Sequence, residues 1–175
     1  MKLARGDRRG LGFFDTSIDG VWRSFRAALI CYPFYLVMLA FRIDAALWQS
    51  AGVVTIVAVE TIAYVISWVG FPLLILPLTR FLDREERFLA FIVVYNWCQL
   101  PQTALFFVIA ADGALGLLPP AAAQSLELAA AVAVLIYDWY IARVTLAISG
   151  LAALPIILID LLLGTVLSRV SEGLY

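Results

Sequence analysis

Long apolar runs separated by short polar segments make up most of the chain. A helix needs about 20 apolar residues to cross about 30 Å of hydrocarbon, and five segments come close to that length. The pattern therefore predicts an all-α, polytopic integral membrane protein. A membrane domain, residues 24–168, lies between a leading segment, 1–23, and a short tail, 169–175. The predicted membrane spans are residues 24–41, 51–71, 88–111, 126–148 and 151–168.

Residues 45–79 form one long apolar stretch whose length fits neither one upright span nor two spans. As one helix it would be about 52 Å long, which is too long for an upright span, yet it is short for two spans with a turn. We expect a piece in the membrane interface at 47–50, anchored by Trp48. The second span then follows, and a broken stretch that contains Pro72 and Pro77 leads into the next loop.

The segment before the first span has helical periodicity. Ile18, Trp22 and Phe25 recur at i, i+4 and i+7, which is typical of an amphipathic helix, and Asp15 or Ser17 could cap its start. Two arrangements remain open, because this helix either lies in the membrane interface or forms the first turns of the first span. The residues expected to anchor the chain at the membrane boundary are Trp22, Trp48 and Arg42.

Short connectors separate the later spans. Residues 111–125 carry glycine and proline and predict a loop, Ser149-Gly150 predicts a tight turn, and small residues such as Ala129 and Ala133 would permit close helix contact. The connector after the second span is densely charged and is predicted to be solvated, although it could also serve as a cytoplasmic docking surface. Its charged residues are Arg80, Asp83, Arg84, Glu85, Glu86 and Arg87.

The composition agrees with a membrane protein and excludes several function classes. The chain is 64% hydrophobic and 14% charged, whereas soluble domains are about half apolar and about a quarter charged. Its net charge of −1 offers no basic footprint for nucleic acid. The chain has no His and no nucleophile or phosphate-binding motif, so we expect no catalysis, cofactor or metal. Cys31 and Cys98 lie in apolar runs and are expected to be small core residues.

The basic residues predict the orientation of the chain. Cytoplasmic segments of membrane proteins carry an excess of Lys and Arg. With a cytoplasmic N-terminus, ten of the 12 basic residues fall on the cytoplasmic side, and only Arg42 and Arg169 fall on the other. The sequence therefore predicts a cytoplasmic N-terminus and a C-terminus on the opposite side, and we expect the bacterial inner membrane as the location.

Four charged residues fall at membrane depth, where each costs about 2.5–3.5 kcal/mol on insertion scales. Counted from the last turn, Asp138 and Asp160 lie at nearly the same depth. An ion pair between Arg143 and Asp160 is the preferred arrangement, and Glu60 could approach Asp138 from a facing helix. Three acids against one Arg leave two negative charges, which must be compensated by protons, water or a cation.

The third span adds a polar patch at the same depth. Asn96, Gln99 and Thr103 share one helix face, and Pro101 frees a backbone carbonyl near them. These groups either hold helices together through hydrogen bonds or form a path for a proton or solute. The predicted buried polar cluster comprises Glu60, Asn96, Gln99, Asp138, Arg143 and Asp160.

Two segments carry a family resemblance. A charged loop runs into ERFLAFIVVYNWCQLP, and a final hairpin, LIYDWYIARVTLAISGLAALPIILIDLLLG, turns at Ser149-Gly150 with Pro155 just beyond. Over about residues 80–168 this order resembles the bacterial branch of the Yip (Ypt/Rab-interacting) family. The resemblance implies five membrane helices and a cytoplasmic N-terminus. Eukaryotic relatives bind small GTPases through a longer N-terminal region, whereas about 23 residues precede the first span here, and no binding residue carries over.

Two hypotheses of function follow. The first is a non-catalytic inner-membrane protein that acts through helix packing with other subunits or with itself, as a membrane organiser or an accessory subunit of a larger complex. The alternative is a small proton- or solute-translocating transporter or channel subunit that uses Glu60, Asp138, Arg143 and Asp160. The two aspartates also meet the minimal condition for intramembrane proteolysis, but the motif residues of such proteases are missing.

Overall fold

The computed structural model describes residues 15–175, and this part of the chain is helical without strands. The predicted basic tail falls on residues 1–14, which lie outside the described residues. Five helical segments are long and apolar enough to cross a membrane, which confirms the all-α, five-span prediction. The helices are α1 (Ile18–Ser24), α2 (Arg26–Arg42), α3 (Ala45–Ala51), α4 (Val53–Phe81), the 3₁₀ helix η3 (Glu85–Arg87), α5 (Phe88–Leu115), α6 (Pro120–Thr145) and α7 (Gly150–Glu172).

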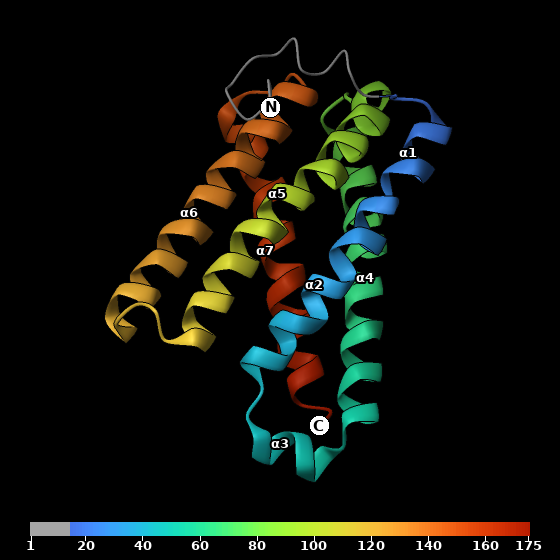
Figure 1. Cartoon of the computed structure of the whole chain (residues 1–175). Coiled ribbons are helices and arrows are strands. Elements are labelled where there is room, and N and C mark those ends of the chain that lie inside the picture. Colours follow the sequence, from blue (N-terminus) through green and yellow to red (C-terminus); the bar gives the residue numbers. More distant parts are fainter. Residues whose placement is uncertain (1–14) are drawn as a thin grey trace.

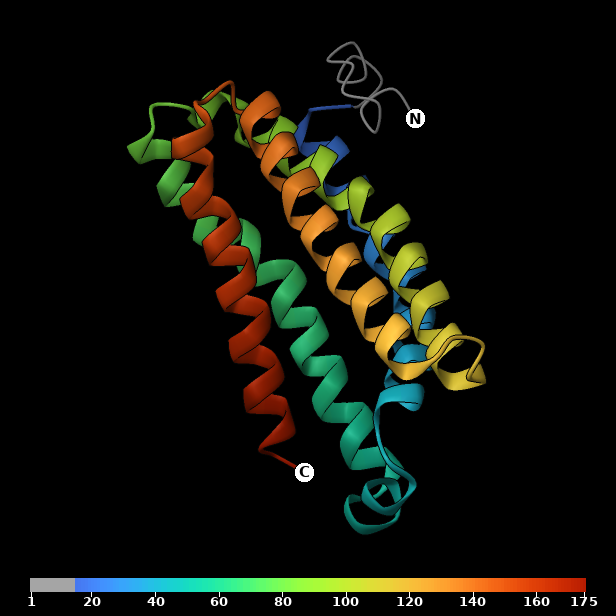
Figure 2. The same ribbon diagram turned by 90° about the vertical axis from the view of Figure 1, so that its left-hand side faces the viewer.

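The long helices form two groups that meet at one end of the molecule. Helices α2, α5 and α6 pack side by side, and α4 packs against α7 (Figure 1). The α6–α7 hairpin joins the two groups, which diverge toward the end that holds the C-terminus and α3 (Figure 2). The start of α1 and the connector between α4 and α5 both lie at the other end (Figure 1).

The packed core lies at the end where the two groups meet. Its largest buried side chains come from α4, α5, α6 and α7, and Phe71 stacks on Tyr95 with ring centroids 4.3 Å apart. Cys31 and Cys98 are both free and buried. Lipid supplies no hydrophobic force between helices, so close packing and hydrogen bonds must hold this core together. Its fully buried members include Ile75, Phe91, Ile92, Ile141, Leu146 and Ile156.

The path of residues 45–79 differs from the prediction. α3 matches the separate piece expected before the second span, and Gly52 makes the turn after it with a positive φ of 83°. The expected break near Pro72 and Pro77 is wrong, because α4 continues through both prolines to Phe81. Membrane helices tolerate proline where neighbouring helices and hydroxyl groups satisfy the freed backbone.

The predicted loop at 111–125 is much shorter in the structure. α5 runs on to Leu115 and ends at Gly116, whose φ of 64° is left-handed, and α6 already starts at Pro120. Proline at the first helical position loses no hydrogen bond, and the alanines that follow it are the strongest helix formers. Helix propensity therefore outweighed the Gly and Pro signals that predicted a long loop.

The last hairpin turns where the sequence predicts it. The Ser149 hydroxyl caps α7 by accepting a hydrogen bond from the Ala152 amide at 3.2 Å. A Cβ at Gly150 would lie 2.7 Å from the Trp139 ring, so only glycine lets the two helices approach this closely. Both helix ends shift by a few residues, because α6 ends at Thr145 and α7 continues past the predicted end to Glu172.

Helix α1 leads into α2 through Phe25 and extends the first span. Of the two expected caps, Ser17 fills the role, since its hydroxyl accepts from the Gly20 amide at 3.0 Å. The exposed face carries Trp22, whereas Gly20 and Ser24 are buried, and α1 packs on α5. Small residues of α1 face the neighbouring helix, and large apolar residues face outward. This arrangement is typical of helices packed in a membrane, where small residues allow close helix contact.

Candidate functional site

A cleft of about 880 Å³ lies between α2, α4, α5, α6 and α7. Phe71 and Asp160 line it next to the packed core, and Arg169 and Glu172 line it toward the C-terminal end of the molecule. Ligand pockets commonly have volumes of about 300–1,000 Å³. The cleft is therefore large enough for an organic molecule, and it lies at membrane depth.

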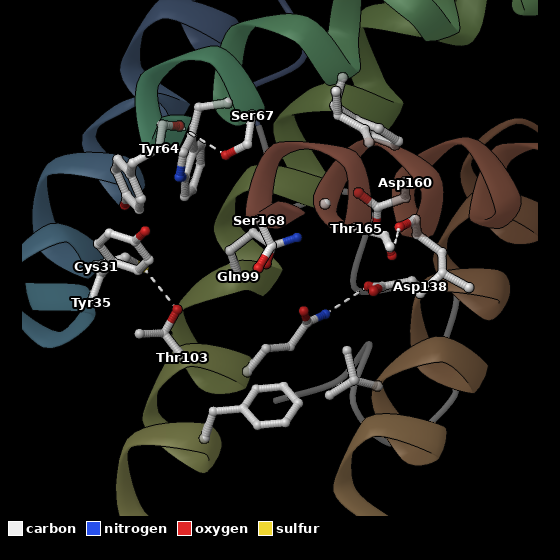
Figure 3. Close-up of a pocket in the computed structure, with 18 of the residues that line it drawn as sticks. Cys31, Tyr35, Tyr64, Ser67, Gln99, Thr103, Asp138, Asp160, Thr165 and Ser168 are labelled. Carbon is white, nitrogen blue, oxygen red and sulfur yellow. Dashed lines mark hydrogen bonds between the residues drawn. The ribbon is translucent and has the colours of Figure 1, made fainter. Parts of the chain in front are cut away.

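Two acidic side chains form one wall of the cleft (Figure 3). Asp138 of α6 is only 3% exposed, and its Oδ1 accepts a hydrogen bond from Gln102 Nε2 at 2.6 Å. Asp160 of α7 accepts a hydrogen bond from the Tyr95 hydroxyl at 2.8 Å. The structure thus brings to one cleft the two aspartates that the sequence places at one depth.

Neither aspartate has a basic partner among residues 15–175. The ion pairs in this part of the chain all involve other acids. Arg169 lines the same cleft, but it follows Asp160 by nine residues on α7, about 13 Å along the helix axis, and Glu172 lies one turn beyond it. The wall therefore carries two carboxylates whose charge needs a proton or a cation for compensation.

The predicted ion pair between Arg143 and Asp160 is wrong. Arg143 is exposed, and its guanidinium carbon lies 5.4 Å from the centre of the Trp139 ring. Five residues separate Arg143 from Asp138, which turns the two side chains about 140° apart around α6. Because Asp138 faces the cleft, Arg143 faces away from it.

Glu60 also lies elsewhere than expected, because it does not approach Asp138. Its side chain is 2% exposed and borders a second cavity, of about 220 Å³, toward the C-terminal end. Four side chains donate hydrogen bonds to its carboxylate, and we call this group the Glu60 hub. The four donors are Tyr35, Arg42, Ser171 and Tyr175.

The Glu60 hub ties the end of the chain to α4. The Tyr175 hydroxyl lies 2.6 Å from Glu60 Oε1, the Ser171 hydroxyl lies 3.1 Å from it, and Arg42 Nη2 lies 3.3 Å from it. Burial, and then the hydrogen bond to Glu60, raise the pKa of Tyr175 to about 12, so its phenol remains a donor at neutral pH. Arg42, expected as an interface anchor, is half exposed and forms the ion pair of this hub.

The polar face predicted on the third span has two roles, since one residue connects helices and another lines the cleft. Asn96 Nδ2 donates to the Ser24 hydroxyl at 2.9 Å, which fastens α5 to α1, and Gln99 lines the cleft. Gln102 and Tyr95 belong to the polar patch of the same span, but the sequence analysis did not predict that they would donate hydrogen bonds to the two aspartates. A polar side chain within an apolar run was the signal that could have drawn attention to each of them. Their partners could not be predicted, because these lie on helices far away in the sequence.

Aromatic side chains of α2 and α4 form the opposite wall of the cleft (Figure 3). The Tyr35 and Tyr64 ring centroids are 4.9 Å apart, and the Tyr64 and Trp68 centroids are 6.0 Å apart. The Tyr64 hydroxyl donates to the Ala28 carbonyl at 2.7 Å, which fixes the ring. The sequence interpretation did not include this wall, because aromatic residues are common in all of the spans.

The remaining predicted residues lie away from the cleft. Trp22 is 72% exposed on α1, and Trp48 is half-buried on α3. The connector residues form exposed local pairs, such as Arg80 with Glu85 at 2.9 Å.

The described residues contain no group of three or more side chains placed to hold a metal ion. No family model, no curated protein and no solved structure matches the chain. The resemblance to the Yip family therefore stays a prediction.

Proposed function

We propose that this chain binds a cation in the cleft and carries it across the membrane, as a small transporter or as a channel subunit. One observation carries the proposal. Asp138 and Asp160 face a cleft at membrane depth, and no basic side chain among residues 15–175 pairs with them. Each aspartate also accepts one hydrogen bond from α5, so the support for a ligand is the open volume beside them and the missing basic partner.

Each aspartate keeps unused capacity for hydrogen bonding. Within the described part of the chain, Asp138 accepts one hydrogen bond, from Gln102, and Asp160 accepts one, from Tyr95. A carboxylate can accept about four. The remaining lone pairs are available to a cation or its donor groups.

We propose that the route of the cation leads toward one end of the molecule. The smaller cavity beside Glu60 shares Tyr35, Ser67 and Ser168 with the cleft and continues toward the C-terminal end. At the other end the packed core closes it. Transport would then require α4 and α7 to move against α2, α5 and α6, so that the closed end opens.

The orientation of this route follows from the predicted topology. We propose that the N-terminus is cytoplasmic, in the inner membrane, because most basic residues then lie inside. The open end of the cleft would face the non-cytoplasmic side.

The accessory-subunit function is the second candidate, and the same cleft favours it. A basic side chain on a partner helix could supply the charge that Asp138 and Asp160 lack. Ala129 and Ala133 are exposed on α6 and would let a second partner helix pack closely on the face of α6 that is turned away from the cleft.

Flux measurements in liposomes test the proposal. Purified protein is reconstituted, and the movement of H⁺, Na⁺ and K⁺ is followed with internal dyes under an imposed membrane potential. We expect a flux that the Asp138→Asn, Asp160→Asn double variant loses and that Glu127→Gln, an exposed acid on the same helix as Asp138, retains. Absence of flux, together with stoichiometric co-purification of a larger complex, would favour the accessory subunit.

A further inference from the structure

The two walls of the cleft differ in chemistry. Asp138 and Asp160 lie on one side, Tyr35 and Tyr64 lie on the other, and Gln99 lies between them (Figure 3). A ligand that fills the cleft would contact both walls at once. Its chemistry must therefore suit carboxylates and aromatic faces together.

Aromatic faces and carboxylates both attract positive charge. A cation over an aromatic ring gains about 0.5–1 kcal/mol at exposed sites and about 2 kcal/mol when water is excluded. Trp68, the residue type with the strongest attraction, lines the cleft beside Tyr64. The aromatic rings also offer apolar area to the uncharged part of a ligand.

The volume and the lining exclude other ligand classes. A bare metal ion needs several oxygen ligands around one point, and the described residues hold no group of three or more His, Cys, Asp or Glu side chains placed for one. A neutral apolar molecule would leave both aspartates uncompensated, and an anion would be repelled by them. About 880 Å³ is also far more volume than a proton or a small inorganic ion requires.

We infer that the ligand of the cleft is a hydrophobic organic cation, an amine or quaternary onium compound with an aromatic body. Its charged centre lies at Asp138 and Asp160, and its aromatic body lies against Tyr64 and Trp68. This inference rests on the proposed function, because it names the class of cation that the same cleft takes. At the outer end of the cleft, the lining carries one basic and one acidic side chain, Arg169 and Glu172.

Binding of two molecules of equal shape and opposite charge tests the inference. Tetraphenylphosphonium and tetraphenylborate are titrated separately into the full chain in lipid nanodiscs, with equilibrium dialysis as the readout and empty nanodiscs as background. We expect saturable binding of the phosphonium only. Asp138→Asn with Asp160→Asn should weaken it by at least about tenfold, which is about 1.4 kcal/mol.

A second variant separates the two walls. Trp68→Leu removes one aromatic face and keeps both carboxylates, so we expect a loss of up to about thirtyfold, in line with one cation–π contact from which water is excluded. Glu127→Gln is the matched control and should bind as the wild type does. Each variant is first shown to give a monodisperse size-exclusion peak, so that a loss of binding reports on the cleft.

The possible outcomes separate this inference from the proposed function. Equal binding of the borate and the phosphonium, or phosphonium binding that both cleft variants retain, would overturn the inference, because partition into lipid would then explain the signal. Flux of H⁺, Na⁺ or K⁺ without phosphonium binding would overturn the inference and leave the proposed function standing. Phosphonium binding without any flux would support the ligand class and contradict transport.

Discussion

Glu60 accepts hydrogen bonds from four side chains, whereas Asp138 and Asp160 accept one each. All three acids lie within spans of the same bundle. Arg42 pairs with Glu60, and no basic side chain among the described residues pairs with either aspartate.

The difference separates a structural acid from acids that remain available to a ligand. The Glu60 hub joins α2, α4 and the end of the chain, and its carboxylate is satisfied within the protein. The aspartates lie between two helix groups that diverge beside them, and they line open volume. Burial alone therefore does not distinguish Glu60 from Asp138, whereas the number and charge of their partners do.

The comparison predicts the largest loss of stability at Glu60. Glu60→Leu leaves the hydroxyls of Tyr35 and Tyr175 without their acceptor, so we expect the free energy of unfolding to fall by about 2–4 kcal/mol. Unfolding by SDS, followed by circular dichroism, measures it. Glu127→Leu removes an exposed acid and should change the value by less than about 0.5 kcal/mol. Equal losses in the two variants would show that the hub does not stabilise the fold.

Removal of one donor from the hub should have a smaller effect. Tyr175→Phe deletes one hydrogen bond to Glu60, and we expect a loss of about 0.6–1.7 kcal/mol. The pKa of Tyr175 is raised to about 12, so this contribution is fully present below the value of a free phenol, about 10, and is lost as the pH rises through about 12.

The difference in the free energy of unfolding between the Tyr175→Phe variant and the wild type should therefore be constant from about pH 6 to about pH 9. SDS unfolding at three pH values checks this prediction. A difference that disappears at the alkaline end of this range would contradict the contact with Glu60.

The aspartates should behave in the opposite way. Asp138→Asn removes a charge that has no basic partner in the described structure and keeps the shape of the side chain, so stability should stay within about 1 kcal/mol of the wild type, on the stabilising side. The same SDS titration measures it. A loss as large as that of Glu60→Leu would mean that Asp138 is a structural acid, and the distinction between the two sites would fail.

The fold could be predicted from the sequence because the backbone has to satisfy its own hydrogen bonds in the hydrocarbon core of a membrane, which favours helices. Apolar length gave the five spans, and charge counting indicates that α1 and the charged connector share one side, as they share one end in the structure (Figure 1). Helix ends were less predictable. The prolines of α4 lie inside its helix and do not break it, and helix propensity outweighed the Gly and Pro signals between α5 and α6.

The site could be predicted only in part. Depth along a hairpin placed Asp138 and Asp160 together, because rise per residue is fixed. Partner choice depends on how each helix is rotated about its axis, and apolar runs on all faces leave that rotation undetermined. Glu60 was therefore assigned to the wrong neighbours, and the tyrosines that hold it and Asp160 were missed.

Arg143 gives the smallest expected effect and the sharpest contrast between sequence and structure. An ion pair with Asp160 would make Arg143→Leu cost about 3–5 kcal/mol, since a buried charge would lose its partner. In the structure the side chain is exposed over Trp139, and loss of such a contact costs about 0.5–1 kcal/mol before the gain from placing a leucine against lipid. We therefore expect a net change within about 0.5 kcal/mol. A double-mutant cycle with Asp160→Asn measures the coupling, which should be close to zero. A coupling energy above about 1 kcal/mol would show that Arg143 interacts with Asp160. Arg143 would then be the basic partner that the two aspartates of the cleft lack in the structure.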